Sequence, residues 1–314
     1  MPSNKDMKRK LEKLKRILKE MDTVVIAFSG GVDSSFLARV AADVLGAGNV
    51  VLCTALSETY PADEAARAAQ LARTLGARHV TLHTREMDNP LFASNPPDRC
   101  YHCKSELFSR LENLRKRLGF KFVADGANAD DDNDFRPGRA AAAMLNVRSP
   151  LAEARLTKAE IRAASRSLRL PTWNLPAAPC LSSRFPYRTP ITTDALRKVE
   201  NAEKFLINEG FKTVRVRHHG DVARVEVHPS EMKKFFSDGL REKVAAAFKS
   251  IGYHYAALDL LGYRHGSMNE VLSPGEMEIS KNPAGISPRS ATPGAPAPRR
   301  SGGKTSKKKC TTKN

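Results

Sequence analysis

The chain has 314 residues, 41% of them hydrophobic, so it is long enough for two domains and can bury a sizeable core. It has no run of 18 apolar residues, and its first ten residues, MPSNKDMKRK, contain no apolar signal segment, so we expect a cytoplasmic protein that does not enter a membrane. Its five cysteines are odd in number and unevenly spaced, which argues against a disulfide framework and leaves catalytic or metal-binding roles open.

The net charge of +18 is concentrated near the two ends of the chain. Residues 281–314 carry +9 and residues 5–20 carry +5, which leaves +4 for the rest. A nucleic-acid-binding domain usually gathers its positive charge on one face or along one helix. The distribution therefore argues only weakly for a nucleic-acid partner such as tRNA.

Strands and helices alternate through the first half of the chain. A basic amphipathic helix at 7–21 precedes strands at 24–27, 50–54, 79–83 and 122–126, with helices from 34, at 61–75 and up to 118 between them. An alternation with a period of about 30 residues is typical of the α/β class with a doubly wound parallel sheet, which binds ligands at the carboxyl ends of its strands. We expect the amphipathic helix to pack on the edge of this sheet.

The second half of the chain breaks this rhythm. A short helix at 139–145 and a helix opened by a capping box of Thr157 and Glu160 precede a proline-rich loop at 170–187. A helix at 194–208, a hairpin at 214–227, two further helices and a strand at 255–260 predict a small α+β domain. We therefore divide the chain into a nucleotide-binding domain (1–170), a cysteine-bearing loop (171–190), a small domain for substrate binding or oligomerisation (191–274) and a disordered basic tail (275–314).

The stretch SGGVDS joins the first strand to the next helix and predicts a phosphate-binding loop. Gly30 and Gly31 allow backbone N–H groups and the helix N-terminus to approach phosphate oxygens closely. Ser29 and Ser34 add hydroxyl donors, and Asp33 can hold a Mg²⁺ ion that bridges phosphates. The lysine of GxxxxGK[ST] and the GxGxxG pattern are both missing, which excludes the kinase type of loop and a dinucleotide fingerprint.

Three later stretches of the chain contain further candidate site residues, which are cysteines and charged residues. Cys100 and Cys103 have CxxC spacing at the expected start of a helix, where both thiols can face one point and the helix end lowers their pKa. This pattern suits a metal, a cluster or redox chemistry, and a zinc site or simple reduced thiols stay open as alternatives. Asp130 lies in an acidic run at a strand end, which either binds Mg²⁺ or forms a solvated turn. Cys180 and Arg184 lie in the proline-rich loop.

Seven stretches together carry a family resemblance. SGGVDS resembles the signature of the PP-loop ATP pyrophosphatase superfamily, whose members adenylate a substrate oxygen with ATP and release pyrophosphate. With DRCYHCKSELF, DGANADD, DFRPGRAA, SPLAEARLTKAEIR, PCLSSRFPY and RVRHHGDVARVEV, the chain resembles the LarE family of ATP-dependent sacrificial sulfur transferases along most of its length except the basic tail. That family builds the nickel-pincer nucleotide cofactor of lactate racemase.

The resemblance implies a small mononucleotide substrate. Family members adenylate a carboxylate of a pyridinium biscarboxylate mononucleotide, and sulfur then displaces AMP to give a thiocarboxylate. Some draw the sulfur from one cysteine, at the position of Cys180, which is left as dehydroalanine. Others hold a 4Fe–4S cluster with that cysteine and a CxxC pair, and Cys100, Cys103 and Cys180 match this cluster-type subgroup. A persulfide resolved by a second cysteine is a third source of sulfur.

The resemblance also implies roles for the other candidates. The residues of SGGVDS bind ATP and Mg²⁺, and Asp33, Cys180 and Arg184 are the candidate catalytic residues. Asp130 and Arg184 are candidate contacts to the nucleotide or the substrate. A homo-oligomer is expected as well.

The hairpin carries the last candidate site. From strand alternation alone, we interpret Arg215, Arg217 and Glu226 as residues of an exposed face. The resemblance implies a phosphate or metal site at the same three residues. These two interpretations differ in how buried the side chains should be.

Three other functions stay open from the sequence. A tRNA thiolation enzyme would share the loop and the cysteines, and the basic ends could bind RNA. An amide-forming ligase of the NAD or GMP synthetase kind would share the loop but has no role for CxxC and Cys180. A non-enzymatic ATP-binding scaffold would use the cysteines only structurally.

Overall fold

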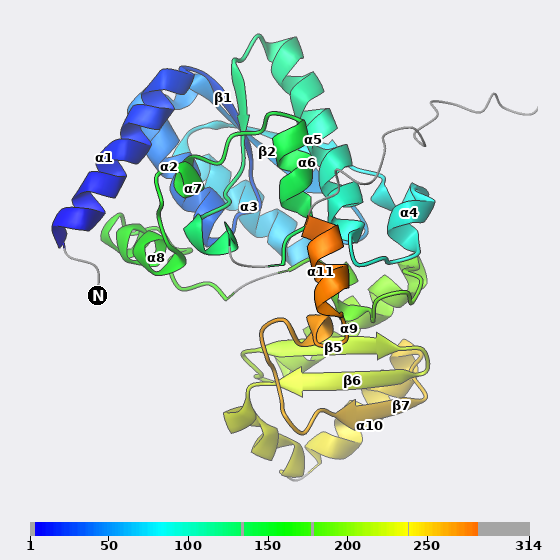
Figure 1. The fold of residues 1–314 in the computed structure, drawn as a ribbon. Coiled ribbons are helices and arrows are strands. Elements are labelled where there is room, and N and C mark those ends of the chain that lie inside the picture. The colour runs from blue at the N-terminus through cyan, green and yellow to red at the C-terminus, as the bar shows by residue number, and fades with distance from the viewer. Residues whose placement is uncertain (1–3, 133–134, 177–178, 238, 282–314) are drawn as a thin grey trace, which may run out of the picture. The chain divides into compact units, whose positions relative to one another are not determined.

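The computed structural model describes residues 4–132, 135–176, 179–237 and 239–281, which belong to one compact unit with two β-sheets (Figure 1). The larger sheet consists of the parallel strands β1 (Val24–Ala27), β2 (Val50–Leu56), β3 (Arg78–His83) and β4 (Phe122–Ala124). Their order is β3-β2-β1-β4, so the predicted parallel α/β sheet is confirmed. The winding reverses between β1 and β4, and ligands of open α/β sheets bind at such a reversal.

Helices connect and cover these strands. They are α1 (Asn4–Met21), α2 (Val32–Leu45), α3 (Ala62–Leu75), α4 (Pro90–Ala93), α5 (Arg99–Leu118), α6 (Gly138–Met144), α7 (Pro150–Glu153) and α8 (Lys158–Ser167). Short 3₁₀ helices are η1 (Ala47–Asn49), η2 (Glu86–Asp88) and η3 (Ala129–Asp132).

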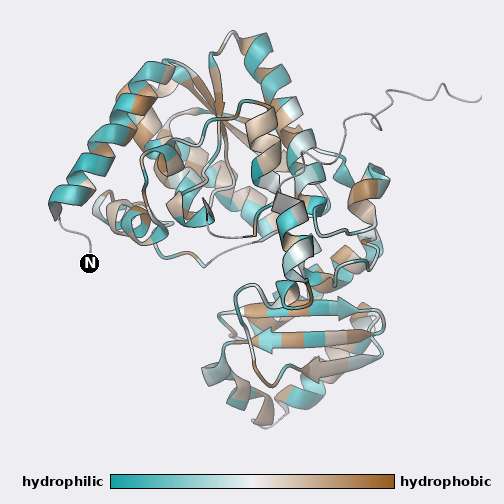
Figure 2. Ribbon diagram, viewed as in Figure 1, coloured by the Kyte–Doolittle hydropathy of each residue, from teal (hydrophilic) through white to brown (hydrophobic). Residues whose placement is uncertain are grey.

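Alternate residues of β1 face different helices, which makes the sheet doubly wound. Val24 and Ile26 lie in one hydrophobic core with Phe36 of α2. Val25 lies in a second core with Phe108 of α5. Strands buried on both faces are nearly continuous apolar runs, which explains the sequence VVIA. Figure 2 shows the hydrophobic colour concentrated on the central strands, whereas α1 is mostly hydrophilic.

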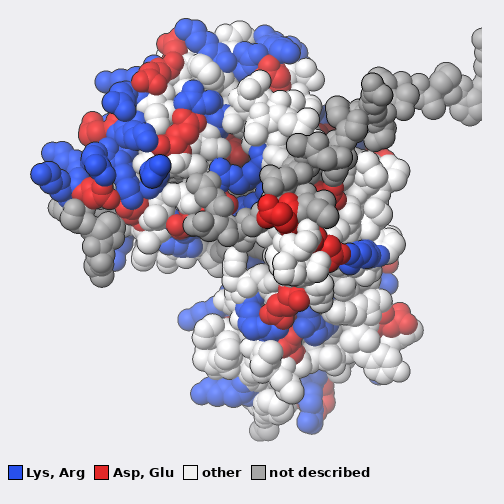
Figure 3. Space-filling model, in the orientation of Figure 1, with Lys and Arg blue, Asp and Glu red and all other residues white. Residues whose placement is uncertain are grey.

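Helix α1 packs on other helices and shares their core with the sheet, and its expected position on the sheet edge stays a prediction. Leu14 and Leu18 are fully buried in the first core, and the helix contacts α2 and α7. A narrow apolar stripe is sufficient for this contact, and the remaining surface of α1 carries Lys and Arg (Figure 3). No helix in the described part of the chain combines the length and the apolar character needed to cross a membrane.

The second sheet belongs to the C-terminal part of the described chain. Its strands are β5 (Val214–His219), β6 (Val222–Val227) and β7 (Tyr255–Leu258). The accompanying helices are η4 (Leu181–Arg184), α9 (Thr193–Asn208), η5 (Pro229–Phe236), α10 (Leu240–Ile251), η6 (Ser267–Asn269) and α11 (Pro274–Lys281). The predicted hairpin is confirmed, because β5 and β6 pair antiparallel across Gly220 and Asp221, while β7 adds to β6 in parallel.

The small sheet has a hydrophobic core of its own. Val216 and Val225 pack with Leu206 of α9 and Phe248 of α10. This separate core agrees with a small α+β region, and its expected boundaries at residues 191 and 274 stay a prediction.

Helix α11 replaces the first part of the expected disordered tail. The Ser273 hydroxyl accepts a hydrogen bond from the backbone N–H of Glu276 at 3.3 Å, and the Glu276 carboxylate accepts one from the Ser273 N–H at 2.9 Å. This capping box, together with the Arg188–Glu276 ion pair, starts a helix where composition alone predicted none. The rest of the predicted tail lies outside the described residues.

Candidate active site

The predicted phosphate-binding loop connects β1 to α2. Gly30 adopts φ +67°, and Gly31 is the N-cap of α2, so the helix begins at Val32, two residues before the predicted start. The Ser29 and Ser34 hydroxyls lie 3.1 Å apart, and Ser29 Oγ accepts a hydrogen bond from the Gly31 N–H at 3.3 Å. The first N–H groups of a helix have no partner within the helix, so they can bind an anion.

Backbone packing holds this loop on two sides. A Cβ atom at Gly30 would lie 2.9 Å from the Cα of Ala68 on α3. A Cβ atom at Gly126, in the loop after β4, would lie 3.0 Å from the backbone nitrogen of Ser34. The loops that follow β1 and β4 therefore meet at the reversal of the sheet.

Replacing Gly30 with alanine is expected to destabilise the fold by about 1–3 kcal/mol, because alanine disfavours this positive φ. The added methyl group also collides with α3, so the loop should move and ATP binding should weaken. Chemical denaturation and calorimetric ATP titration would measure both effects. Gly48→Ala is the matched control, since a Cβ there meets no described atom within 4 Å. Equal stability of the two variants would contradict this account.

Asp33 combines an ion pair with an unsatisfied oxygen. Its Oδ2 accepts a hydrogen bond from the Lys158 ammonium. Its Oδ1 is buried and has no hydrogen-bond partner among the described residues. Burial raises the pKa of Asp33, although the positive charge of Lys158 acts in the opposite direction. A buried carboxylate oxygen without a partner beside a phosphate-binding loop fits a ligand of Mg²⁺.

Asp130 supports the start of α8. Its Oδ2 accepts the backbone N–H of Lys158 at 2.8 Å. The neighbouring Asp131 accepts a hydrogen bond from the N–H of Asn128 at 3.0 Å and pairs with Arg136 at 2.9 Å. Both carboxylates are therefore engaged within the protein, and the predicted contact of Asp130 with a nucleotide stays a prediction.

Two consecutive residues after β2 connect the phosphate-binding loop to the loop of Cys180. The Tyr60 hydroxyl donates to the carbonyl oxygen of Ser29 at 2.8 Å. The carbonyl oxygen of Thr59 accepts the N–H of Leu181 at 2.9 Å. The loop of Cys180 is thus linked to the phosphate-binding loop through two residues, although the two loops are far apart in the sequence.

The three predicted thiols are related electrostatically. A negative charge on Cys180 would raise the pKa of both Cys100 and Cys103, and the described cysteines form no disulfide. Burial raises the pKa of Cys100 and of Cys103, which is the opposite of the lowering expected from the helix start. Burial disfavours a thiolate more strongly here than the N-terminus of α5 favours it.

Three cations act electrostatically on the thiol of Cys100. The positive charges of Arg99, Lys104 and Arg136 all favour its thiolate. Helix α6 approaches closely, since a Cβ atom at Gly138 would lie 3.3 Å from the carbonyl oxygen of Cys100. The charge of Arg136 acts on Asp33 as well as on Cys100, so the phosphate-binding loop and the thiols share one electrostatic environment.

The three thiols are suitable donors for an iron–sulfur cluster, but their side chains are not arranged around a common point in the described structure. Three cysteines are a suitable donor set for such a cluster, and the neighbouring cations would offset its thiolate charge. Among the described residues, no group of three or more His, Cys, Asp or Glu side chains is arranged to hold a metal ion. The donor chemistry therefore fits a cluster, whose binding would require these side chains to move together.

Arg184 holds the loop of Cys180 in place. It is 3% exposed, and its Nε and one terminal nitrogen donate to the carboxylate of Glu203 at 2.9 and 2.8 Å. The other terminal nitrogen donates to the carbonyl oxygens of Pro179 and Cys180 at 2.6 and 3.0 Å. These bonds direct the guanidinium toward the protein and hold the loop in place, while the predicted catalytic role of Arg184 and its contact with nucleotide or substrate stay predictions.

Glu203 is a member of this site that the sequence analysis did not identify. Its Oε1 also accepts the backbone N–H of Val216 at 2.9 Å, so one carboxylate joins α9, β5 and the cysteine-bearing loop. An acidic residue inside an amphipathic helix gives no local signal of such a role. Lys158 was missed too, although the capping box of Thr157 marks the helix start beside it.

The hairpin residues Arg217 and Glu226 are buried, so their interpretation as an exposed face is wrong. Arg217 donates to Glu226 at 2.6 Å and to the carbonyl oxygen of Ser183 at 3.0 Å, and Glu226 is 0% exposed. Arg215 lies over the ring of Tyr263, with 5.3 Å between its Cζ and the ring centre. The expected phosphate or metal site at these residues stays a prediction.

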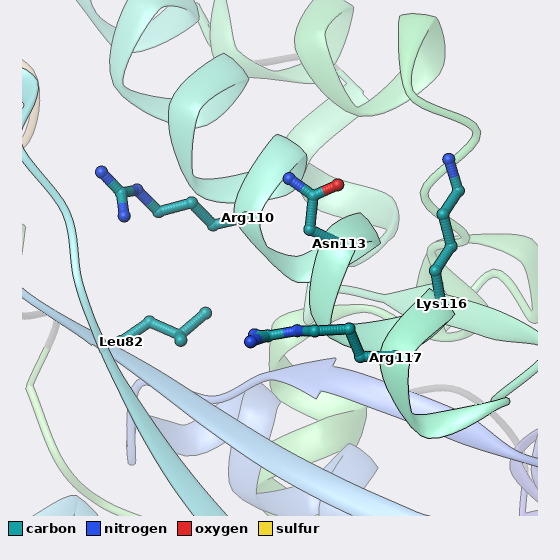
Figure 4. Close-up of a pocket in the computed structure, with 5 residues that line it drawn as sticks. All are labelled: Leu82, Arg110, Asn113, Lys116 and Arg117. Atoms are coloured by element: carbon teal, nitrogen blue, oxygen red, sulfur yellow. The ribbon is translucent and has the colours of Figure 1, made fainter.

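A basic cavity of about 500 Å³ lies elsewhere, between β3 and α5. Its lining residues are Leu82, Arg110, Asn113, Lys116 and Arg117. Figure 4 shows Arg117 extending from α5 toward Leu82 on β3. None of the predicted ATP-binding or sulfur-site residues lines it, so it is separate from the candidate active site.

Comparisons with known proteins agree with an α/β fold of the PP-loop type. A family model described as NAD synthase matches residues 7–129. An uncharacterised protein of Synechocystis is 44% identical over 85% of this chain and 99% of its own length, and one of Methanocaldococcus jannaschii is 29% identical over 82% and 98%. The pyridinium-3,5-bisthiocarboxylic acid mononucleotide synthase of Lactiplantibacillus plantarum is 38% identical over 83% of this chain and 94% of its own length. The chain therefore belongs to the family of that synthase, the LarE family within the PP-loop superfamily.

Proposed function

We propose that this protein is an ATP-dependent sulfur transferase that converts a carboxylate of a pyridinium biscarboxylate mononucleotide to a thiocarboxylate. The observation that supports the proposal is the hydrogen-bonded link from the Cys180 loop through Thr59 and Tyr60 to the phosphate-binding loop. Through this link, a sulfur-bearing group would lie near the site where ATP would react. The Lactiplantibacillus relative is named as the synthase of a bisthiocarboxylic acid mononucleotide, which agrees with a thiocarboxylate product.

The first half-reaction is the adenylation of the substrate. A carboxylate oxygen of the mononucleotide attacks the α-phosphorus of ATP, the bond to the bridging oxygen breaks, and pyrophosphate leaves. The N–H groups at the start of α2 and the hydroxyls of Ser29 and Ser34 would bind the leaving pyrophosphate. Asp33 would hold Mg²⁺ through its unpartnered oxygen.

The second half-reaction replaces AMP with sulfur. A sulfur nucleophile attacks the acyl carbon, and AMP leaves with one of the carboxylate oxygens. Cys100, Cys103 and Cys180 would hold a 4Fe–4S cluster, which would supply the sulfur through the iron that no cysteine ligates. The same residues leave two other sources open, which are the sulfur of Cys180 itself and a persulfide.

Product analysis tests this function. Protein purified without oxygen is mixed with ATP, Mg²⁺ and the pyridinium biscarboxylate mononucleotide, and pyrophosphate release is followed with mass spectrometry of the product. We expect substrate-dependent pyrophosphate release and the exchange of one oxygen for sulfur. An amide formed from ammonia would instead identify a ligase like NAD synthetase. The matching NAD synthase model ends at residue 129, before Cys180, and such a ligase has no use for the three thiols.

A further inference from the structure

Glu86 carries a buried carboxylate that the proposed reaction has not used. It is the first residue of η2, soon after β3, and it is 3% exposed. In the described part of the chain this carboxylate forms no ion pair, and its partners are the hydroxyls of Ser57 and Thr59. We propose that Glu86 is a positioning residue of the sulfur-transfer step, because it fixes the turn after β2 that holds the loop of Cys180. This inference rests on the proposed function for the transfer step.

Two hydroxyl groups converge on one oxygen of Glu86. Its Oε1 accepts a hydrogen bond from the Ser57 hydroxyl at 2.6 Å and another from the Thr59 hydroxyl at 2.8 Å. The Ser57 oxygen in turn accepts the backbone N–H of Thr59 at 3.2 Å. A hydroxyl has one proton to donate, and both protons are given to the same carboxylate. The turn formed by residues 57–59 is therefore held in one hydrogen-bonded arrangement.

The same turn holds the loop of Cys180. The carbonyl oxygen of Thr59 accepts the backbone N–H of Leu181 at 2.9 Å, and Thr59 is itself 4% exposed. Leu181 is buried in a hydrophobic core, and the side chain of Cys103 packs against this core. Thr59 therefore connects Glu86 to the loop of Cys180, and Leu181 connects that loop to Cys103.

Helix α5, which carries Cys103, is attached to the segment of Glu86 as well. The backbone N–H of Arg85 donates to the carboxylate of Glu106 on α5 at 2.7 Å, and η2 contacts α5. The negative charge of Glu86 also acts on the thiol of Cys103. Because α5 and the turn after β2 both hold this segment, Glu86 sets the position of the Cys180 loop relative to Cys103.

The burial of this carboxylate does not serve stability alone. A buried charge is costly without a cation beside it, and the described partners of Glu86 are two neutral hydroxyls. An apolar residue of similar size would avoid this desolvation cost. A hydrogen-bonded network in the interior instead selects a single arrangement of the groups that join it. What the carboxylate supplies is therefore the arrangement of the turn at 57–59.

The variant Glu86→Met tests the inference, because it removes both hydrogen bonds and keeps a side chain of similar length. A hydrogen bond to a charged group is strong enough to change an equilibrium roughly 10-fold. We therefore expect thiocarboxylate formation to slow roughly 10-fold and Cys180 to be alkylated roughly 10-fold faster, with ATP affinity within a few-fold of the wild type. Alkylation is measured by mass spectrometry on the full chain, after a chelator has removed any bound metal.

Two further variants separate positioning from charge. Glu86→Gln loses the charge, but its amide oxygen still accepts hydrogen bonds, so it should restore most of the transfer rate. Thr59→Val loses the donated hydroxyl and keeps the backbone carbonyl that holds Leu181, so it should reproduce the effect of Glu86→Met. The double variant should be little slower than either single variant, because both break the same contact. Additive effects, or a Glu86→Gln variant as slow as Glu86→Met, would overturn the positioning role.

Glu231→Met is the matched control. Glu231 is also buried, at 8% exposed, and it accepts the backbone N–H of Lys212 at 3.2 Å in the part of the chain that carries the small sheet. This control should lower the melting temperature and leave the transfer and alkylation rates unchanged. If Glu86→Met loses stability but keeps both rates of the wild type, the inference is wrong while the proposed function stands. If the wild type forms no thiocarboxylate, the proposed function is wrong, and the alkylation rates alone decide whether Glu86 holds the loop.

Discussion

Replacing Cys180 with alanine is expected to abolish sulfur transfer and to leave ATP binding within a few-fold of the wild type. The proposed second half-reaction needs this thiol, whereas the proposed contacts with ATP belong to the hydroxyls of Ser29 and Ser34 and to the start of α2. Product analysis and calorimetry would measure the two properties separately. A variant that still forms the thiocarboxylate would contradict the role of Cys180.

Iron and acid-labile sulfide analysis of protein purified without oxygen distinguishes the sulfur sources. We expect about four irons per chain, as a 4Fe–4S cluster requires, and their loss in Cys100→Ala, Cys103→Ala and Cys180→Ala. Cys53→Ala is the control, because Cys53 is buried inside β2, where burial raises its pKa to about 12. Absence of iron, with a loss of H₂S from the protein mass after turnover, would identify Cys180 as a sacrificed donor and overturn the cluster.

Replacing Arg184 with alanine is expected to lower the free energy of unfolding by about 3–5 kcal/mol, the usual cost of breaking a buried ion pair from one side. The variant would leave the carboxylate of Glu203 buried with only the N–H of Val216 as a remaining partner among the contacts described above. The loop of Cys180 would also lose its bonds to the guanidinium. Denaturant unfolding measures the stability, and alkylation of Cys180 measures how accessible the loop has become.

Arg39→Ala provides the comparison for this effect. Arg39 and Asp43 form an exposed pair on α2 at 2.9 Å, and such surface pairs contribute about 1 kcal/mol or less. Arg184→Lys keeps the charge and loses the two-pronged geometry, so it should fall between the wild type and Arg184→Ala. Equal stability of Arg184→Ala and Arg39→Ala would show that Arg184 does not anchor the loop.

Local patterns were sufficient to predict the sheet and the phosphate-binding loop. The run VVIA is apolar because β1 is buried on both faces, and the adjacent glycines permit the turn before α2. The hairpin and the capping box of Thr157 followed from alternation and from spacing in the same way. Helix α11 was not predicted, because its first residues include proline and glycine, although Ser273 and Glu276 form a capping box there.

The sequence by itself determined which groups are present: a glycine-rich loop before a helix, a carboxylate in the first turn of that helix and three thiols. Only the tertiary structure decided which charged residues form ion pairs. Lys158 reaches Asp33, Arg184 binds Glu203, and Arg217 pairs with Glu226 in the interior instead of facing solvent. Burial likewise reversed the expected pKa shift of Cys100. Strands, turns and caps are set by neighbours along the chain, whereas ion-pair partners and desolvation depend on residues that folding brings together.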